Sequence, residues 1–112
     1  MKLNYPARFY KEDDGYGVIF VDLDMCYSQG KNLNDAITMA SEAAEGWLLT
    51  GLIRGDSIPE PSNPSSITTQ KEYEQIIVVP VDVDKLLSEL WQTLTEKYRS
   101  ALTRVTMLQT AQ

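Results

Sequence analysis

Apolar and polar residues alternate in two segments, one on each side of a turn signal. This pattern constrains the fold more than any other feature of the sequence. In "LNYPARFYKEDDGYGVIFVDL", apolar residues recur at every second position before and after "EDDG". They are Tyr5, Ala7, Phe9, Tyr16, Val18 and Phe20. A two-residue period places these side chains on one face of a strand, and acidic residues followed by glycine favour a tight turn. The stretch therefore predicts a β-hairpin.

A helix is predicted after a short third strand in "MCYSQG". Asn32 can accept a hydrogen bond from the first turn, and Asp35 lies where the positive end of a helix favours an acidic residue. Apolar residues then recur at three- and four-residue steps between residues 33 and 52, which is the spacing of one buried helix face. Gly51 and Gly55 bracket the expected end of this helix.

The second half of the chain contains a connection and one further strand before a long tail. The connection "SIPEPSNPSSITTQ" has three prolines and four serines, which predicts a loop or an extended linker. The segment "YEQIIVVPVDV" is rich in β-branched residues and predicts a strand, in which Pro80 belongs at an end, an edge or a bulge. The order of elements gives an α+β fold for residues 1–84, with three antiparallel strands, a helix and a further strand.

The tail "DKLLSELWQTLTEKYRSALTRVTMLQTAQ" predicts a long amphipathic helix over residues 85–112. Its main apolar stripe repeats at steps of four and three residues: Leu87, Trp91, Leu94, Tyr98, Ala101, Val105 and Leu108. We expect an oligomerisation element that forms a homodimer or a higher homo-oligomer. Packing within the chain and a fragment of an appended module are the alternatives. The flanking positions lack paired opposite charges, which favours a broad helix–helix face over a two-stranded coiled coil.

Charge and composition narrow the classes of function. The chain has 112 residues and a net charge of −6, so most of its surface should repel nucleic-acid phosphates and suit a basic protein. It has no histidine, which excludes Ser-His and Cys-His nucleophile pairs and histidine zinc sites. Cys26 is the single cysteine and is expected to be a small buried hydrophobe. No cofactor is expected.

The sequence also argues against secretion and membrane insertion. Its start, "MKLNYPARFYKEDD", lacks an apolar run of signal-peptide length, and "GWLLTGLI" is too short to span a bilayer. We therefore expect a cytoplasmic protein.

Several segments, taken in order, resemble the HicB family, the antitoxin halves of bacterial HicAB toxin–antitoxin pairs. The matching segments are "YPARFYKEDDGYGVIFVDL", Cys26, "SQGKNLNDAITMASEAAEGWL", "IPEPS" and "VVPVDV". The resemblance covers residues 1–84 and implies a partial ribonuclease-H-like domain. It implies that this domain binds and blocks a small basic toxin, which cleaves RNA through a histidine. It also implies dimers or higher oligomers and, in many members, a C-terminal DNA-binding module that represses the operon.

Two segments depart from the pattern of the family. The usual turn reads like "PDLPGC", whereas this chain has "VDLDMC", with Asp24 and Met25 in place of the Pro-Gly pair. After Asp84 the sequence offers one helix, and neither a helix-turn-helix nor a basic strand before a helix pair is evident. DNA binding by this chain is therefore less expected than for the family at large.

The acidic residues of the first half leave three roles open. Asp22 and Asp24 lie two apart on an extended segment, and with Glu42 they are candidate metal ligands of a ribonuclease-H-like site. They equally suit turn formation or contact with a basic partner. We favour the last two roles, and predict no catalytic or metal-binding residue. The predicted partner-binding residues are Glu12, Asp13, Asp14, Asp22 and Asp24.

The leading hypothesis is an antitoxin without enzymatic activity that occludes a small basic RNA-cleaving toxin. Three alternatives stay open: a regulator that binds RNA or DNA, a degenerate ribonuclease-H-like enzyme, and an orphan domain without a toxin. The acidic net charge favours a protein partner over nucleic acid.

Overall fold

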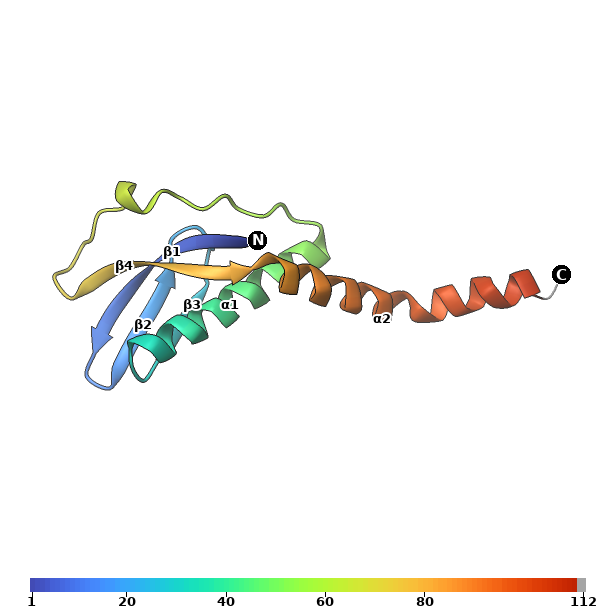
Figure 1. The fold of residues 1–112 in the computed structure, drawn as a ribbon, viewed down its shortest axis with the longest axis horizontal. Coiled ribbons are helices and arrows are strands. Elements are labelled where there is room, and N and C mark those ends of the chain that lie inside the picture. Colours follow the sequence, from blue (N-terminus) through green and yellow to red (C-terminus); the bar gives the residue numbers. More distant parts are fainter. Residues whose placement is uncertain (111–112) are drawn as a thin grey trace.

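The computed structural model is an antiparallel sheet covered on one face by a helix, with a second helix extending from it (Figure 1). It describes residues 1–110, apart from the side chains of residues 102, 109 and 110. Residues 111 and 112 of the predicted tail helix lie outside the described part. The molecule measures 71 × 29 × 23 Å because the second helix extends well beyond the sheet. No helix within residues 1–110 is long and apolar enough to cross a membrane.

Four antiparallel strands form the sheet in the order β3-β2-β1-β4. Their bounds are β1 (Lys2–Glu12), β2 (Gly15–Phe20), β3 (Tyr27–Gly30) and β4 (Glu74–Asp82). β1 and β2 form the predicted hairpin, in which Glu12 pairs with Gly15. The prediction for Pro80 is confirmed, because β4 is an edge strand and one of its sides needs no ladder partner.

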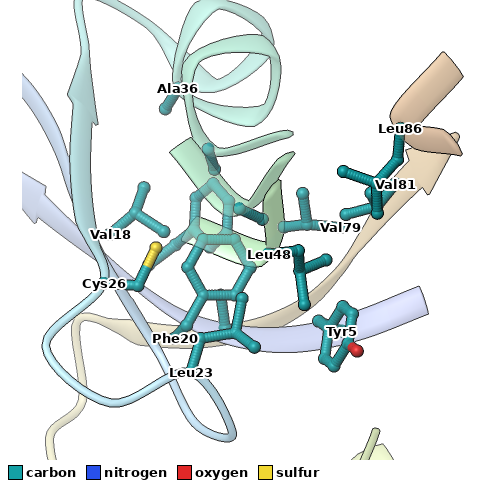
Figure 2. Packing of buried hydrophobic residues seen from close by; sticks show 14 residues of the cluster. Tyr5, Val18, Phe20, Leu23, Cys26, Ala36, Leu48, Val79, Val81 and Leu86 are labelled. Atoms are coloured by element: carbon teal, nitrogen blue, oxygen red, sulfur yellow. The ribbon is translucent and has the colours of Figure 1, made fainter. Parts of the chain in front are cut away.

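The helix α1 (Leu33–Arg54) covers the face of the sheet that carries the apolar hairpin residues. Figure 2 shows the buried side chains of β1, β2 and β4 gathered beneath this helix. In the middle of α1 the fully buried residues are the small Ala36, Ala40 and Ala44, which allows the helix to approach the sheet closely. An added Cβ on Gly30 would lie only 2.3 Å from the backbone nitrogen of Ala36, so this crossing requires glycine. The predicted inward faces of the hairpin and of the helix are thus confirmed.

Both ends of α1 are capped as the sequence predicts. Asn32 Oδ1 accepts a hydrogen bond of 2.8 Å from the N–H of Asp35, and the Asp35 carboxylate accepts one of 2.8 Å from the N–H of Lys31. Gly55 ends the helix in the left-handed conformation, with φ of 87°. Gly51 lies within the last turns of the helix.

The proline-rich connection between α1 and β4, residues 56–73, is held against the sheet, and we call it the strap. It contains one short 3₁₀ turn, Pro64–Ser66. The Tyr5 hydroxyl donates a hydrogen bond of 2.6 Å to the carbonyl oxygen of Pro59. The Asp22 carboxylate accepts hydrogen bonds from both the N–H and the hydroxyl of Ser62. The strap is therefore ordered against its own domain.

The strap then crosses the outer face of the sheet, which is the face opposite α1. Arg8 Nη1 donates hydrogen bonds of 3.0 Å to the Thr68 carbonyl and 3.1 Å to Glu74 Oε2. Glu74 also accepts a hydrogen bond of 2.6 Å from the N–H of Gln70, and its side chain is fully buried. Burial raises the pKa of Glu74, but the bonds from Gln70 and Arg8 outweigh burial and lower the pKa below its ordinary value of 4.5.

The turn between β2 and β3 contains one strained residue. Met25 has a φ of 62°, in the left-handed region, which costs a residue with a side chain roughly 1–2 kcal/mol. Leu23 anchors the turn because it is fully buried, and the Asp24 carbonyl accepts a hydrogen bond of 2.8 Å from Trp47 Nε1. β3 therefore begins only at Tyr27, later than the segment "MCYSQG" predicts.

The helix α2 (Val83–Thr110) begins inside the domain and then leaves it (Figure 1). In its first turn Leu86 is fully buried, and Lys85 Nζ lies 3.4 Å from Glu45 Oε2 on α1. The predicted boundary after residue 84 therefore falls within a turn that packs on the domain. The later turns extend away from the sheet.

The Arg8–Glu74 pair should make stability depend on pH. A folded-state pKa below 4.5 means that ionised Glu74 contributes stability above that pH and loses it as pH falls through the folded-state pKa. We expect Glu74→Gln to lower the free energy of unfolding at pH 7 by about 1–3 kcal/mol. The difference from the unmodified chain should shrink below pH 4.5. Urea denaturation at several pH values measures this difference in the free energy of unfolding. A difference independent of pH would contradict the role of ionised Glu74.

The turn at Met25 offers a test of backbone strain. Because Met25 is 71% exposed, its replacement loses little packing. We expect Met25→Gly to be more stable than Met25→Ala by about 0.5–1 kcal/mol, since both remove the same side-chain contacts and only glycine relieves the left-handed strain. Thermal denaturation of the two variants makes the comparison. An alanine variant at least as stable as the glycine variant would show that the turn is unstrained.

Candidate functional site

The turn of the β1–β2 hairpin gathers Glu12, Asp13 and Asp14, which we call the acidic tip. All three residues are exposed. Within residues 1–110, none of them forms a salt bridge. Figure 1 shows this turn at the end of the molecule opposite the C-terminal end of α2. The acidic tip is therefore a set of solvated negative charges that a cationic partner can approach.

Two shallow hollows, each of about 510 Å³, flank the acidic tip. The helix-side hollow lies between the hairpin and the start of α1, and its side chains include Glu12, Asp14, Tyr16, Lys31, Asp35 and Met39. The outer hollow lies on the face opposite α1 and includes Tyr10, Lys11, Asp13, Ile19, Lys71 and Tyr73. Both combine carboxylates with aromatic and aliphatic groups. Such a lining suits the charged head and apolar stem of an arginine or lysine side chain.

The outer hollow already holds a cation from the chain itself. Lys71 Nζ lies 5.7 Å from the ring centroids of both Tyr10 and Tyr73, which is within the range of a cation–π interaction. Burial and the neighbouring Glu74 carboxylate raise the pKa of Tyr10, so its hydroxyl keeps its proton at neutral pH. A cation from a partner would replace Lys71 over these rings or bind beside it.

Asp22 and Asp24 lie at the other end of β2 and do not join the acidic tip. The six residues of β2 separate the two groups, which corresponds to roughly 20 Å along an extended strand. The Asp22 carboxylate is half-buried and bound by Ser62, whereas Asp24 is exposed. The five predicted partner-binding residues therefore form two separate groups, and Asp22 also holds the strap.

The arrangement of acidic side chains does not support a metal site. Within the described residues, no group of three or more His, Cys, Asp or Glu side chains could hold a metal ion. Cys26 is buried as predicted, and burial raises the pKa of its thiol to about 11. The thiol therefore stays protonated at neutral pH and is a poor nucleophile.

The predicted oligomerisation stripe on α2 lies largely in solvent. Leu94 is half-buried, and Leu86, beside the stripe, is buried in the domain instead. The exposed members are Leu87, Trp91, Tyr98, Ala101, Val105 and Leu108. The stripe is thus available to a partner, and self-association stays a prediction.

Sequence reasoning predicted the acidic residues that line the two hollows but not the aromatic and aliphatic residues beside them. Tyr10 and Ile19 occupy outward positions of the hairpin, and Tyr73 ends the strap. The alternation of the hairpin does place Tyr10 and Ile19 on the face away from the core. No sequence signal brings Tyr73 or Met39 to the same end of the sheet, because both arrive through long-range packing.

Comparison with known proteins identifies the family. Residues 5–106 match the family model described as "HicB_like antitoxin of bacterial toxin-antitoxin system". An uncharacterized 14.9 kDa protein of the rep-hol intergenic region of Haemophilus phage HP1 (strain HP1c1) is 37% identical over 81 residues. The aligned part is 71% of this chain and 60% of that relative, so the chain spans about three fifths of the relative's length.

Solved structures show the same architecture. A chain of the toxin–antitoxin complex from Streptococcus pneumoniae has a TM-score of 0.69 at 20% identity, and the match covers 97% of this chain and 99% of that chain. At this identity the likeness shows the fold alone. A chain of the HicA3 and HicB3 toxin–antitoxin complex has a TM-score of 0.61 at 25% identity over 73% of this chain and 99% of that chain.

These matches confirm the predicted α+β fold, with its antiparallel sheet, its covering helix and its long C-terminal helix. The range that the family model matches, residues 5–106, contains every segment on which the sequence resemblance rests. Because the family model matches residues 5–106, nearly the whole chain, this protein belongs to the HicB-like antitoxin family of bacterial toxin–antitoxin systems.

Proposed function

We propose that this antitoxin binds a small basic RNA-cleaving toxin of the HicA type and inhibits it by covering its active surface. The acidic tip and the two hollows beside it form the binding surface. Inhibition of this kind requires only binding, so the chain acts without catalysis of its own. Family membership supports the antitoxin role, and a structural relative is described as a complex of HicA3 with HicB3.

One observation supports the proposal most strongly: within the described residues, the carboxylates of the acidic tip form no salt bridge, and they lie between two hollows. Carboxylates without internal partners lose no existing ion pair when a cationic protein arrives. They attract it from a distance and increase the association rate at low ionic strength. The rings of Tyr10, Tyr16 and Tyr73 then provide flat apolar surface on which an arginine side chain of the toxin can lie.

The proposal is tested by purifying the antitoxin together with any small basic protein that a neighbouring gene encodes. We expect a stable complex that suppresses RNA cleavage by the toxin and weakens as salt increases. The double variant Glu12→Lys/Asp13→Lys should lower affinity by about tenfold or more at low salt, which corresponds to about 1.4 kcal/mol.

The proposed surface does not include Asp24, although the sequence predicts it as a contact, because it lies at the other end of β2 from the acidic tip. The matched control is therefore Asp24→Lys/Glu60→Lys, which changes the net charge equally but lies away from the acidic tip. Asp24 and Glu60 are exposed, and neither is in a salt bridge within the described chain. We expect this control to retain affinity within about threefold. Equal losses in the two variants would show that net charge alone drives binding, and absence of any complex at low salt would refute the proposal.

A further inference from the structure

Lys71 occupies the outer hollow of the proposed binding surface in the free chain. Its Nζ lies 5.7 Å from the ring centroids of both Tyr10 and Tyr73, so one ammonium group covers both rings. We propose that Lys71 is an internal occupant of a site for an arginine side chain, and that a partner must displace it to reach the rings. This role rests on the proposed function, because it concerns the same surface.

The main chain around Lys71 is fixed, so its side chain alone must move. The N–H of Gln70 donates a hydrogen bond of 2.6 Å to Glu74 Oε2, and the N–H of Glu74 donates one of 3.1 Å to the carbonyl oxygen of Lys71. The N–H of Lys11 donates a longer bond of 3.4 Å to the carbonyl oxygen of Tyr73. These bonds hold the end of the strap beside β1. The flexible stem of the lysine can therefore leave the rings while the strap stays in place.

Few interactions hold the ammonium group of Lys71 over the rings. Lys71 is exposed, and within residues 1–110 it forms no salt bridge. A separation of 5.7 Å lies near the outer limit of about 6 Å for a cation–π interaction, and such contacts are weak at exposed sites. Displacement of Lys71 therefore costs less free energy than a desolvated cation would gain on the same rings.

The side chain of Lys71 also weakens the attraction of the outer hollow for cations. The two lysines of this hollow, Lys11 and Lys71, balance its two carboxylates, Glu12 and Asp13. In the helix-side hollow, by contrast, the carboxylates outnumber the lysine. When Lys71 leaves the rings, the outer hollow carries a net negative charge. The displaced state is therefore the state that attracts a cation from a partner.

The exchange favours arginine over lysine as the group that displaces Lys71. A lysine of a partner would replace one ammonium by another on the same rings and gain no free energy of contact. Lys71 is also tethered beside the rings, which gives it a high effective concentration against a weak competitor. A guanidinium is planar, is more weakly hydrated than an ammonium and stacks on aromatic faces. The outer hollow therefore fits an exposed arginine of a basic partner.

An anionic partner fits the outer hollow less well. A phosphate or carboxylate that approached Lys71 would meet Glu12 and Asp13 in the same hollow and be repelled by them. It would also gain nothing from the two tyrosine rings, because the negative face of an aromatic ring attracts cations. The lining of the hollow therefore favours a cation.

Displacement is measured by NMR spectroscopy of the full chain with two synthetic peptides, hexaarginine and hexalysine. In the free chain we expect ring currents to shift the ε-methylene protons of Lys71 upfield of those of Lys11, and Tyr73→Leu to remove part of this shift. Hexaarginine at low salt should return the Lys71 signal toward the position of an exposed lysine. At equal saturation of the amide shifts of Asp13 and Asp14, hexalysine should move the Lys71 signal less than half as far.

The matched pair of variants is Lys71→Gln and Lys11→Gln, which remove the same charge from the same hollow. Lys11 is exposed and, in the part of the chain that the structure describes, forms no salt bridge. We expect Lys71→Gln to bind hexaarginine about threefold more tightly than Lys11→Gln does, because only Lys71→Gln uncovers the rings. Hexalysine should then also shift the ring signals of Tyr10 and Tyr73 in Lys71→Gln. Amide spectra away from the hollow should match the unmodified chain in both variants.

Three results would overturn this role of Lys71. Equal ε-methylene shifts of Lys71 and Lys11 in the free chain would show that Lys71 does not cover the rings. Saturation of the acidic tip by hexaarginine without movement of the Lys71 signal would show that Lys71 is not displaced. Equal affinities of Lys71→Gln and Lys11→Gln for hexaarginine would show that uncovering the rings gains nothing.

These measurements use no toxin, so they separate the role of Lys71 from the proposed function. A toxin complex that forms despite any of the three results would leave the proposed function intact. The expected peptide results without any toxin complex would refute the proposed function alone.

Discussion

The close packing of α1 on the central part of the sheet is the contact on which the rest of the structure depends. Ala36, Ala40 and Ala44 are fully buried on the helix, and β1 contributes Tyr5 and Phe9 beneath them, with no exposed surface. Because β1 pairs with both β2 and β4, this single contact positions three of the four strands. The strands of the hairpin are therefore fixed by packing, while the acidic turn that joins them extends into solvent.

The strap is the second constraint on the fold, and it contacts the outer face of β1. Arg8 and Glu74 tie it to β1 and β4 at one end, while Asp22 holds Ser62 at the other. A long proline-rich connection would otherwise be mobile and would leave the outer face open. Its attachment brings Tyr73 beside Tyr10, so the outer hollow exists only because the strap is fixed.

The acidic tip and the predicted oligomerisation stripe are far apart along the long axis of the molecule. The acidic tip lies at one end of the sheet, and the exposed stripe of α2 lies beyond the other end (Figure 1). A toxin bound at the tip would leave α2 accessible, and paired α2 helices would leave both tips accessible.

Local patterns in the sequence predicted the elements but not the long-range contacts. The hairpin, the Asn32 cap, the Gly55 stop and the edge position of Pro80 follow from backbone preferences that act within a few residues. The role of Asp22 could not be predicted, because its partner Ser62 is 40 residues away in a loop without periodicity. The acidic residues of the hollows were predicted, but the hollows themselves were not, because their walls come from separate elements that only the fold brings together.

The most direct test is to map the surface of the antitoxin that the toxin covers. Cross-saturation NMR can transfer magnetisation from the protonated toxin to amides of a deuterated antitoxin across the interface. If the toxin binds the acidic tip, the strongest losses of intensity fall at residues 10–16 and 71–73, with little change at residues 21–26 or along α2. Losses confined to residues 21–26 or to α2, with the acidic tip unaffected, would contradict it.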